Sequence, residues 1–211
     1  MPDVRVACVG DSITRGTFVW RRRRNAYPAQ LQVMLGERFC VRNFGVNGRT
    51  VQRAADRPYW GSRAFAASAD FEPDIVLIML GTNDSRGDNW KGVDPFAEDY
   101  RDLVRHYQLL ESHPGVWLLT PPALFRLGRS TKVRYAMDEQ AVREMCGAIA
   151  RIANDLGCSL IDINAATSHH PEAFRLDGVH PGAAGALLIA RTVFEAITEE
   201  AHSFAPRHRR E

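Results

Sequence analysis

The chain has 211 residues, of which 45% are hydrophobic and 25% charged, the composition of an ordinary globular protein. Lysine and arginine number 27 and the acidic residues 25, so the net charge of +2 gives no electrostatic reason to expect nucleic acid as the main partner. The longest apolar run, residues 75–80, is too short to span a bilayer, which predicts a protein without a membrane span.

Five short apolar runs predict β-strands. Each is followed by polar or turn-forming residues. The third run is apolar at successive positions, which is typical of a central parallel strand covered by helices on both faces. The predicted strands are residues 4–9, 39–44, 74–80, 116–120 and 159–164.

Between these runs, apolar residues recur at spacings of three and four, which predicts helices with one buried face. A short helix is expected over residues 27–35, and a longer one begins with Asp94 as N-cap and Pro95 in its first turn. The stripe of this longer helix is Phe96, Tyr100, Leu103, Tyr107 and Leu110.

Two further helices are predicted in the second half of the chain. One ends at Gly157, and the last begins at Pro181. The first of these carries Val142, Met145, Ile149, Ile152 and Leu156 on its buried face. The last carries Leu187, Ala190, Phe194 and Ile197 inward.

The alternation of strands and helices predicts a parallel sheet between two layers of helices. Right-handed crossovers leave few topologies for five strands, and we expect a flavodoxin-like α/β/α sandwich with strand order 2-1-3-4-5. No linker or repeat divides the chain. We therefore expect a single domain over residues 1–200 and a flexible tail over 201–211.

Polar clusters follow the predicted strands where an open α/β sheet places its site, at the carboxyl ends of the strands. They are Gly10-Asp11-Ser12, residues 45–48 and residues 81–84, and a fourth cluster at 177–181 leads into the last helix. Each of these stretches alone is also a common turn, so only their convergence would indicate a site.

Ser12 is the candidate nucleophile. A serine hydroxyl needs a base to take its proton and a third group to orient that base. Asp177 and His180, three residues apart, can supply both, with the carboxylate on Nδ1 and with Nε2 facing the serine.

An oxyanion formed at Ser12 would need hydrogen-bond donors already in place. The backbone N–H of Ser12, the backbone of Gly48 and the side-chain amide of Asn83 are the candidates. Gly45 lies nearer the strand end, and we assign it to the turn.

The stretches "GDSIT", "NFGVNGRT", "GTND" and "DGVHP", in this order, resemble the four signature blocks of the SGNH (GDSL) hydrolase superfamily. The resemblance spans Val6 to Pro181. It implies a flavodoxin-like fold and serine esterase or lipase chemistry on a small ester substrate, without metal or cofactor. It also implies Ser12, Asp177 and His180 as catalytic residues, with an oxyanion hole made by Ser12, Gly48 and Asn83. No G-x-S-x-G surrounds Ser12, which argues against an α/β-hydrolase elbow.

Three alternatives remain open. The segments around the site mix charges with isolated aromatics, which favours short acyl groups and a carbohydrate alcohol, but a lipase or lysophospholipase acting on longer chains is the alternative. A non-catalytic binding domain on this fold is another. A metal-dependent phosphoesterase would use carboxylates and imidazole as ligands. Its candidate ligands are Asp11, Asn83, Asp84, Asp177 and His180.

Several features stay undecided by the sequence. We expect the run Arg21–Arg24 to be a solvated loop, with an anion-binding arm as the alternative, and we expect His169 and His170 on the surface. Aromatic residues in the predicted loops would either line a substrate wall or anchor the loops. These are Trp60, Trp90, Phe125 and Tyr135. The oligomeric state is not indicated.

The cysteines make no C-x-x-C pair and no zinc pattern, so we expect buried free thiols. Together with the absence of a recognisable signal peptide, this predicts a cytoplasmic protein. The cysteines are Cys8, Cys40, Cys146 and Cys158.

Overall fold

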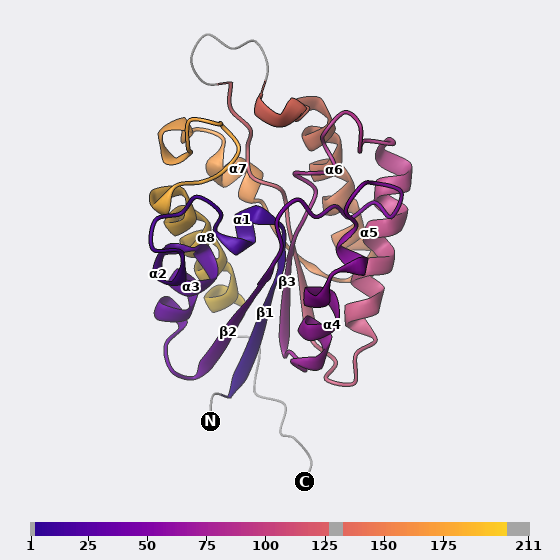
Figure 1. The fold of residues 1–211 in the computed structure, drawn as a ribbon. Coiled ribbons are helices and arrows are strands. Elements are labelled where there is room, and N and C mark those ends of the chain that lie inside the picture. Colours follow the sequence, from indigo (N-terminus) through magenta and orange to yellow (C-terminus); the bar gives the residue numbers. More distant parts are fainter. Residues whose placement is uncertain (1–2, 127–132, 202–211) are drawn as a thin grey trace.

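A computed structural model describes residues 3–126 and 133–201 (Figure 1). Its strands form one sheet in the order β2-β1-β3-β4-β5, and every pairing is parallel, which confirms the predicted topology. The strands are β1 Val4–Gly10, β2 Phe39–Gly45, β3 Ile75–Met79, β4 Gly115–Leu119 and β5 Ser159–Ile161.

The register aligns the carboxyl ends of the first three strands. Gly10 at the end of β1 lies opposite Gly45 on one side and Met79 on the other. The segments that leave β1, β2 and β3 therefore start from one edge of the sheet. Gly45, assigned to a turn from the sequence, is the last residue of β2.

Helices cover both faces of the sheet: α3 and α8 lie on one side, and α4, α5 and α6 on the other (Figure 1). The helices are α1 Ser12–Arg15, α2 Arg22–Asn25, α3 Tyr27–Leu35, α4 Arg63–Asp70, α5 Val93–Gln108, α6 Glu139–Leu156, α7 Ile163–Thr167 and α8 Ala183–Ala201. Short 3₁₀ turns are η1 Tyr59–Gly61, η2 Arg134–Ala136 and η3 Pro171–Ala173.

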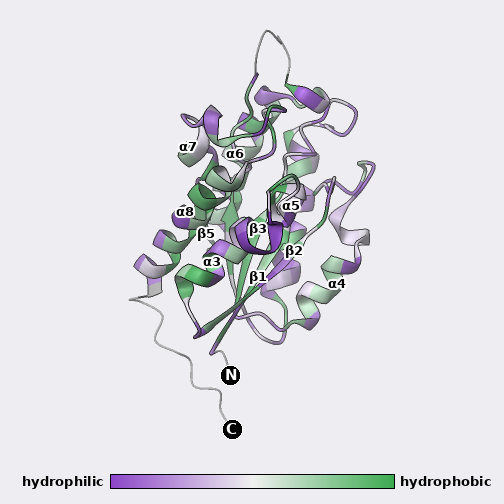
Figure 2. Cartoon of the chain, turned by 60° about the vertical axis from the view of Figure 1, so that its left-hand side comes forward, coloured by the Kyte–Doolittle hydropathy of each residue, from purple (hydrophilic) through white to green (hydrophobic). Residues whose placement is uncertain are grey.

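The central strand β3 contributes to both halves of the core, as its sequence predicts. Val76 and Ile78 pack in the cluster under α5 and α6, whereas Leu77 and Met79 pack in the cluster under α3 and α8. Figure 2 shows the strands in hydrophobic colours between helices of mixed colour. Burial of these apolar side chains on two faces is the main stabilising contribution expected for such a sandwich.

The predicted N-cap of α5 is wrong by two residues, and the predicted stripe extends two residues past the end of the helix. Gly92, with a φ of 101°, precedes the helix, so Asp94 lies in the first turn and is not the N-cap. The carboxylate still stabilises the positive end of the helix dipole from there. The helix ends at Gln108, and Leu110 lies beyond it, half-buried against the core.

The last helix also starts later than predicted. Pro181 forms an isolated bridge with Phe174, and α8 begins only at Ala183. Leu187 and Phe194 are half-buried at the edge of the buried face. That face is formed by Ala186, Ile189, Ala190, Val193 and Ile197.

The predicted fifth strand is too long. β5 ends at Ile161 because Asp162 is the N-cap of α7, its side chain accepting a hydrogen bond from the N–H of Ala165 at 3.0 Å. By contrast, α6 ends as predicted at Gly157, whose φ of 63° suits a residue without Cβ. Apart from Ala201, which ends α8, the predicted tail lies outside the described residues.

All four cysteines are free; Cys8 is buried and the other three are half-buried. Within the described residues, no helix combines the length and the apolar character needed to cross a membrane. A cytoplasmic location stays a prediction.

Candidate active site

Ser12 lies at the first position of α1, at the carboxyl end of β1. Asp11 caps this one-turn helix, its Oδ1 accepting a hydrogen bond from the N–H of Ile13 at 2.8 Å. Gly10 lets the helix fold back onto the strand, since a Cβ there would lie 2.1 Å from the Thr14 hydroxyl oxygen and 2.7 Å from the carbonyl oxygen of Met79. The order Gly-Asp-Ser thus places the hydroxyl at the strand tip.

Asp177 organises the turn that carries His180. Its Oδ1 accepts hydrogen bonds from the N–H groups of Val179 at 3.0 Å and His180 at 2.9 Å. Its Oδ2 lies 2.8 Å from Nδ1 of His180. Gly178 has a φ of 70° and packs so tightly that a Cβ would lie 1.9 Å from the carbonyl oxygen of Phe125. One carboxylate therefore fixes both the turn and the imidazole.

The structure joins the three side chains in one hydrogen-bond chain. Ser12 Oγ lies 3.0 Å from His180 Nε2, and the three residues are 8–9% exposed. Burial alone would raise the pKa of Asp177, but the N–H groups of His180 and Val179 and the imidazole outweigh it and hold the pKa below its ordinary value. The carboxylate next to the imidazole is thus kept ionised.

Asn83 connects the loops after β1 and β2. Its Nδ2 donates to the Arg49 carbonyl at 3.0 Å and to Oδ2 of Asp11 at 3.2 Å. Arg49 and Asp11 are the chain neighbours of Gly48 and Ser12, so the three candidate oxyanion donors lie on adjoining segments. Within the described residues, the backbone N–H groups of Ser12 and Gly48 make no hydrogen bond.

Asp84 is a fully buried carboxylate that holds the loop after β2 in place. It accepts hydrogen bonds from the N–H groups of Val51 at 3.0 Å and Gln52 at 2.8 Å. Burial raises the pKa of Asp84 to about 7, although these N–H donors oppose the rise. Burial likewise raises the pKa of Asp11 to about 7.

The GDSL-like lipase/acylhydrolase family model matches residues 8–188, most of the chain. The chain belongs to this family. The match includes all four sequence blocks, from the Gly10-Asp11-Ser12 turn to the turn of His180, and it confirms the resemblance drawn from them.

Relatives of this GDSL-like protein include two acetylxylan esterases. The one from Xylanibacter ruminicola is 31% identical over 92% of this chain, and the chain spans 43% of that protein's length. The one from Geobacillus stearothermophilus is 28% identical, with 74% of this chain and 71% of the relative covered.

Solved structures share the fold at lower identity. A carbohydrate acetylesterase from Sinorhizobium meliloti superposes with a TM-score of 0.79 at 19% identity, covering 93% of this chain and 99% of that one. An aryl esterase from M. smegmatis superposes with a TM-score of 0.77 at 20% identity, again covering 93% of this chain and 99% of that one. These likenesses support the three-layer fold.

Two exposed aromatic rings flank His180 in this GDSL-like protein. The Phe18 ring lies 5.1 Å from the imidazole, centroid to centroid, and the Tyr135 ring 6.0 Å away, both nearly perpendicular to it. The Tyr135 hydroxyl also reaches Oδ2 of Asp177 at 3.5 Å. Phe18 is 58% exposed and Tyr135 47%.

Both aromatic residues are held in a strained backbone conformation. Phe18 has a φ of 62° and Tyr135 a φ of 61°, values that bulky side chains rarely adopt. Such strain costs on the order of 1–3 kcal/mol per residue and is concentrated at functional sites. The sequence pointed to Tyr135 as a candidate wall residue but not to Phe18, because neither backbone strain nor proximity to His180 is visible in it.

Of the other candidate aromatics, the two tryptophans pack against the core and Phe125 packs against another ring. Trp60 and Trp90 are half-buried against the cluster under α5 and α6, and Phe125 packs on Phe174 with ring centroids 4.8 Å apart. His169 and His170 are exposed, as expected.

The carboxylates proposed as metal ligands do not converge. Asp11 and Asp84 are each hydrogen-bonded to backbone N–H groups, and Asp177 faces His180. Within the described residues, no group of three or more His, Cys, Asp or Glu side chains is placed to hold a metal ion. This geometry does not support the phosphoesterase alternative.

The buried Asp84 predicts a pH-dependent stability. The pKa of Asp84 is higher in the folded protein than in the unfolded chain. Its contribution to the free energy of unfolding is therefore fully present below about pH 4 and is lost as the pH rises through about 7. Asp84→Asn should remove this contribution, at most about 1.4 kcal/mol per pH unit, from the slope of unfolding free energy against pH. Denaturant unfolding between pH 4 and 8 measures it.

The matched control is Asp70→Asn, an exposed position on α4 that should keep the wild-type slope. Equal slopes for the wild type and Asp84→Asn would show that Asp84 ionises as readily in the folded protein as in the unfolded chain.

Proposed function

We propose that the protein is a serine hydrolase that cleaves acetyl and other short acyl esters of carbohydrates through an acyl-enzyme. The observation that carries this proposal is the chain from Ser12 Oγ to His180 Nε2, at 3.0 Å, and from His180 Nδ1 to Asp177, at 2.8 Å. Membership of the GDSL-like family supports the same chemistry.

The geometry supports two half-reactions. His180 Nε2 takes the Ser12 proton as the oxygen attacks the ester carbonyl, and the same proton passes to the departing alcohol. Asp177 keeps the Nδ1 proton in place and stabilises the imidazolium. Water then attacks the acyl-Ser12 ester with His180 again as base, which releases the acid and restores the serine.

Negative charge on the carbonyl oxygen would be stabilised by the N–H groups of Ser12 and Gly48 and by the amide of Asn83. The free N–H groups of the first two support this assignment. A bond from Asn83 to the oxyanion would replace one of its two present contacts, to Arg49 or Asp11.

A carbohydrate alcohol is supported by two independent observations. Two of the relatives are acetylxylan esterases. The exposed rings of Phe18 and Tyr135 beside His180 offer flat apolar faces where the leaving alcohol of the ester would lie. Sugar rings carry C–H groups that pack on such faces, and aromatic side chains supply large contact area at low entropic cost.

Substitutions in the hydrogen-bond chain test the proposal. Ser12→Ala should lower kcat for p-nitrophenyl acetate by about 10³-fold or more, and Asp177→Asn by a similar order, because the nucleophile or the imidazole orientation is lost. Both proteins should remain folded by circular dichroism. The controls Ser168→Ala and Asp70→Asn change exposed positions and should keep wild-type rates.

A Ser12→Ala protein that retained more than about a tenth of wild-type turnover would rule out Ser12 as the nucleophile, because loss of a triad member ordinarily costs far more.

Removing the Phe18 ring should affect sugar binding more than chemistry. For Phe18→Ala we expect KM on an acetylated xylo-oligosaccharide to rise about three- to tenfold, with kcat on p-nitrophenyl acetate nearly unchanged, since a stacked ring contributes about 0.5–1.5 kcal/mol. Phe18→Tyr should restore KM, and Leu109→Ala, at another exposed apolar residue, should leave it unchanged. An unaltered KM in Phe18→Ala would remove the ring from the sugar site.

Acyl length distinguishes this proposal from a lipase. We expect kcat/KM to be higher for p-nitrophenyl acetate and butyrate than for the decanoate, since the loops near the site are rich in arginine and each buried CH₂ is worth about 0.8 kcal/mol only where an apolar groove receives it. A clear preference for decanoate would instead support a lipase or lysophospholipase.

A further inference from the structure

Positive charge is concentrated in one segment near the start of the chain. From Ser12 to Gln52 there are eight arginines and one acidic residue, a net charge of +7; since the whole chain carries +2, the remainder carries −5. Of these eight, only Arg38 forms an ion pair within the described residues, with Asp3. Like charges gathered without counter-charges repel one another, and an anionic partner would relieve this repulsion.

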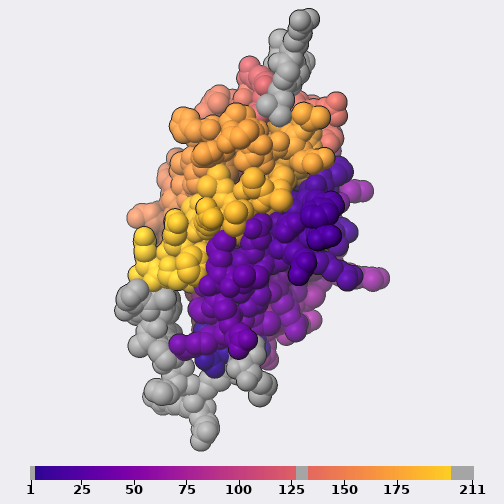
Figure 3. All heavy atoms as spheres, turned by 90° about the vertical axis from the view of Figure 1, so that its left-hand side faces the viewer, coloured from indigo at the N-terminus to yellow at the C-terminus, as the bar shows by residue number. Residues whose placement is uncertain are grey.

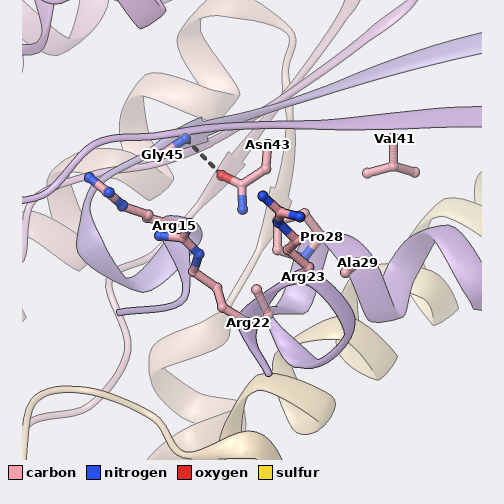
Figure 4. A pocket seen from close by; sticks show the side chains of 9 residues that line it. Arg15, Arg22, Arg23, Pro28, Ala29, Val41, Asn43 and Gly45 are labelled. Carbon is pink, nitrogen blue, oxygen red and sulfur yellow. Dashed lines mark hydrogen bonds between the residues drawn. The ribbon is translucent and has the colours of Figure 1, made fainter. Parts of the chain in front are cut away.

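Three of these arginines line a cavity of about 360 Å³ at the outer edge of the sheet (Figure 4). Arg15 ends α1, and Arg22 and Arg23 lie on α2; their side chains extend toward Asn43 and Gly45 of β2. The volume falls within the range of small-molecule sites, about 300–1,000 Å³. The apolar part of the cavity wall consists of Ala26, Pro28, Ala29 and Val41.

The free donors in this cavity belong to the arginines. Within the described residues the guanidinium groups of Arg15, Arg22 and Arg23 form no ion pair. Asn43 is already engaged, donating to the Thr14 carbonyl and accepting from the N–H of Gly45. A planar guanidinium matches the two oxygens of a carboxylate, so the cavity favours an anion over a neutral hydroxyl.

Helix α1 links the cavity to the candidate active site, because Arg15 lines the cavity and Ser12 begins the same helix. Ser12 is the first residue of α1 and Arg15 the last, so about one helical turn, a rise of roughly 5 Å, separates them along the helix axis. Figure 3 shows the segments of this N-terminal part of the chain as one continuous area beside α8. A substrate that extends beyond its ester could therefore reach both places.

We propose that the cavity of Arg15, Arg22 and Arg23 binds the carboxylate of an acidic sugar unit in the carbohydrate that carries the acyl ester. This inference rests on the proposed function for the identity of the chain, but the anion site itself does not depend on catalysis. The run Arg21–Arg24, expected from the sequence to be a solvated loop, contributes Arg22 and Arg23 of α2 to this proposed subsite.

Kinetics on matched substrates test the inference. The wild type should show a higher kcat/KM for acetylated xylo-oligosaccharides bearing glucuronic acid than for the same oligosaccharides without it. The double variant R22E/R23E should lose at least about tenfold on the acidic substrate, through KM, and little on the neutral one or on p-nitrophenyl acetate. The loss should shrink at high salt, since exposed charges are screened.

A charge-matched control separates the cavity from overall charge. R63E/R191E makes the same change in net charge at two exposed arginines of α4 and α8 and should retain the preference for the acidic substrate. Equal kcat/KM on acidic and neutral oligosaccharides in the wild type, or equal losses in both double variants, would overturn the inference.

Direct binding keeps the test independent of the proposed activity. Titration with D-glucuronate, followed by NMR chemical shifts, should show saturable binding that R22E/R23E abolishes and R63E/R191E keeps, even if no acetylated sugar is hydrolysed. Inorganic phosphate is the second ligand. Saturable binding of phosphate without binding of glucuronate would contradict a carboxylate site and indicate a phosphate site instead.

Discussion

The hydrogen bond between Ser12 Oγ and His180 Nε2 joins residues 168 positions apart in the chain, and the proposed chemistry depends on it. Neither partner reaches the other through local structure. The parallel register brings the ends of β1, β2 and β3 to one edge, and the bridge between Phe174 and Pro181 holds the turn of His180 ahead of α8. Two buried layers of apolar side chains fix this arrangement, so the site is a consequence of the sheet.

Buried carboxylates then set the loops at that edge. Asp11 caps α1, Asp84 holds the segment after Gly48, and Asp177 closes the turn of His180. Each carboxylate accepts hydrogen bonds from backbone N–H groups that would otherwise be unsatisfied. These bonds offset the free-energy cost of burying an ionisable group. The acidic residues of the sequence blocks thus hold the segments that carry Ser12, Gly48 and His180, the residues proposed to act as nucleophile, oxyanion donor and base, and of these carboxylates Asp177 contacts the imidazole.

The strand order and the composition of the core follow from the sequence because hydrophobic periodicity records burial directly. The triad candidates were also predictable, since Asp177 and His180 are close in sequence and the blocks occur in a fixed order. The helix boundaries were harder to predict. Gly92, not Asp94, precedes α5, and Pro181 pairs with Phe174 before α8 begins. The helix α4 escaped prediction because its buried face is small, with Ser68 its one buried residue.

The side chains that surround the site were the hardest to predict from the sequence. An aromatic residue in a loop looks the same in sequence whether it packs inward, as Trp60 does, or stands beside His180, as Tyr135 does. Arg15 acquires its position only because the backbone of α1 lies directly against Gly45, and Phe18 follows α1 by three residues. In the proposals made above, one short segment after β1 therefore carries the nucleophile Ser12, the aromatic contact Phe18 and the charged contact Arg15.

The most direct measurement of the central claim is covalent trapping of the nucleophile. The protein is treated with an organophosphonate ester reagent and analysed by intact mass and peptide mapping. One adduct per chain, located on Ser12 and accompanied by complete loss of p-nitrophenyl acetate hydrolysis, is the predicted result. A protein that hydrolyses the ester while remaining unlabelled, or that carries the adduct on a different residue, would contradict the account.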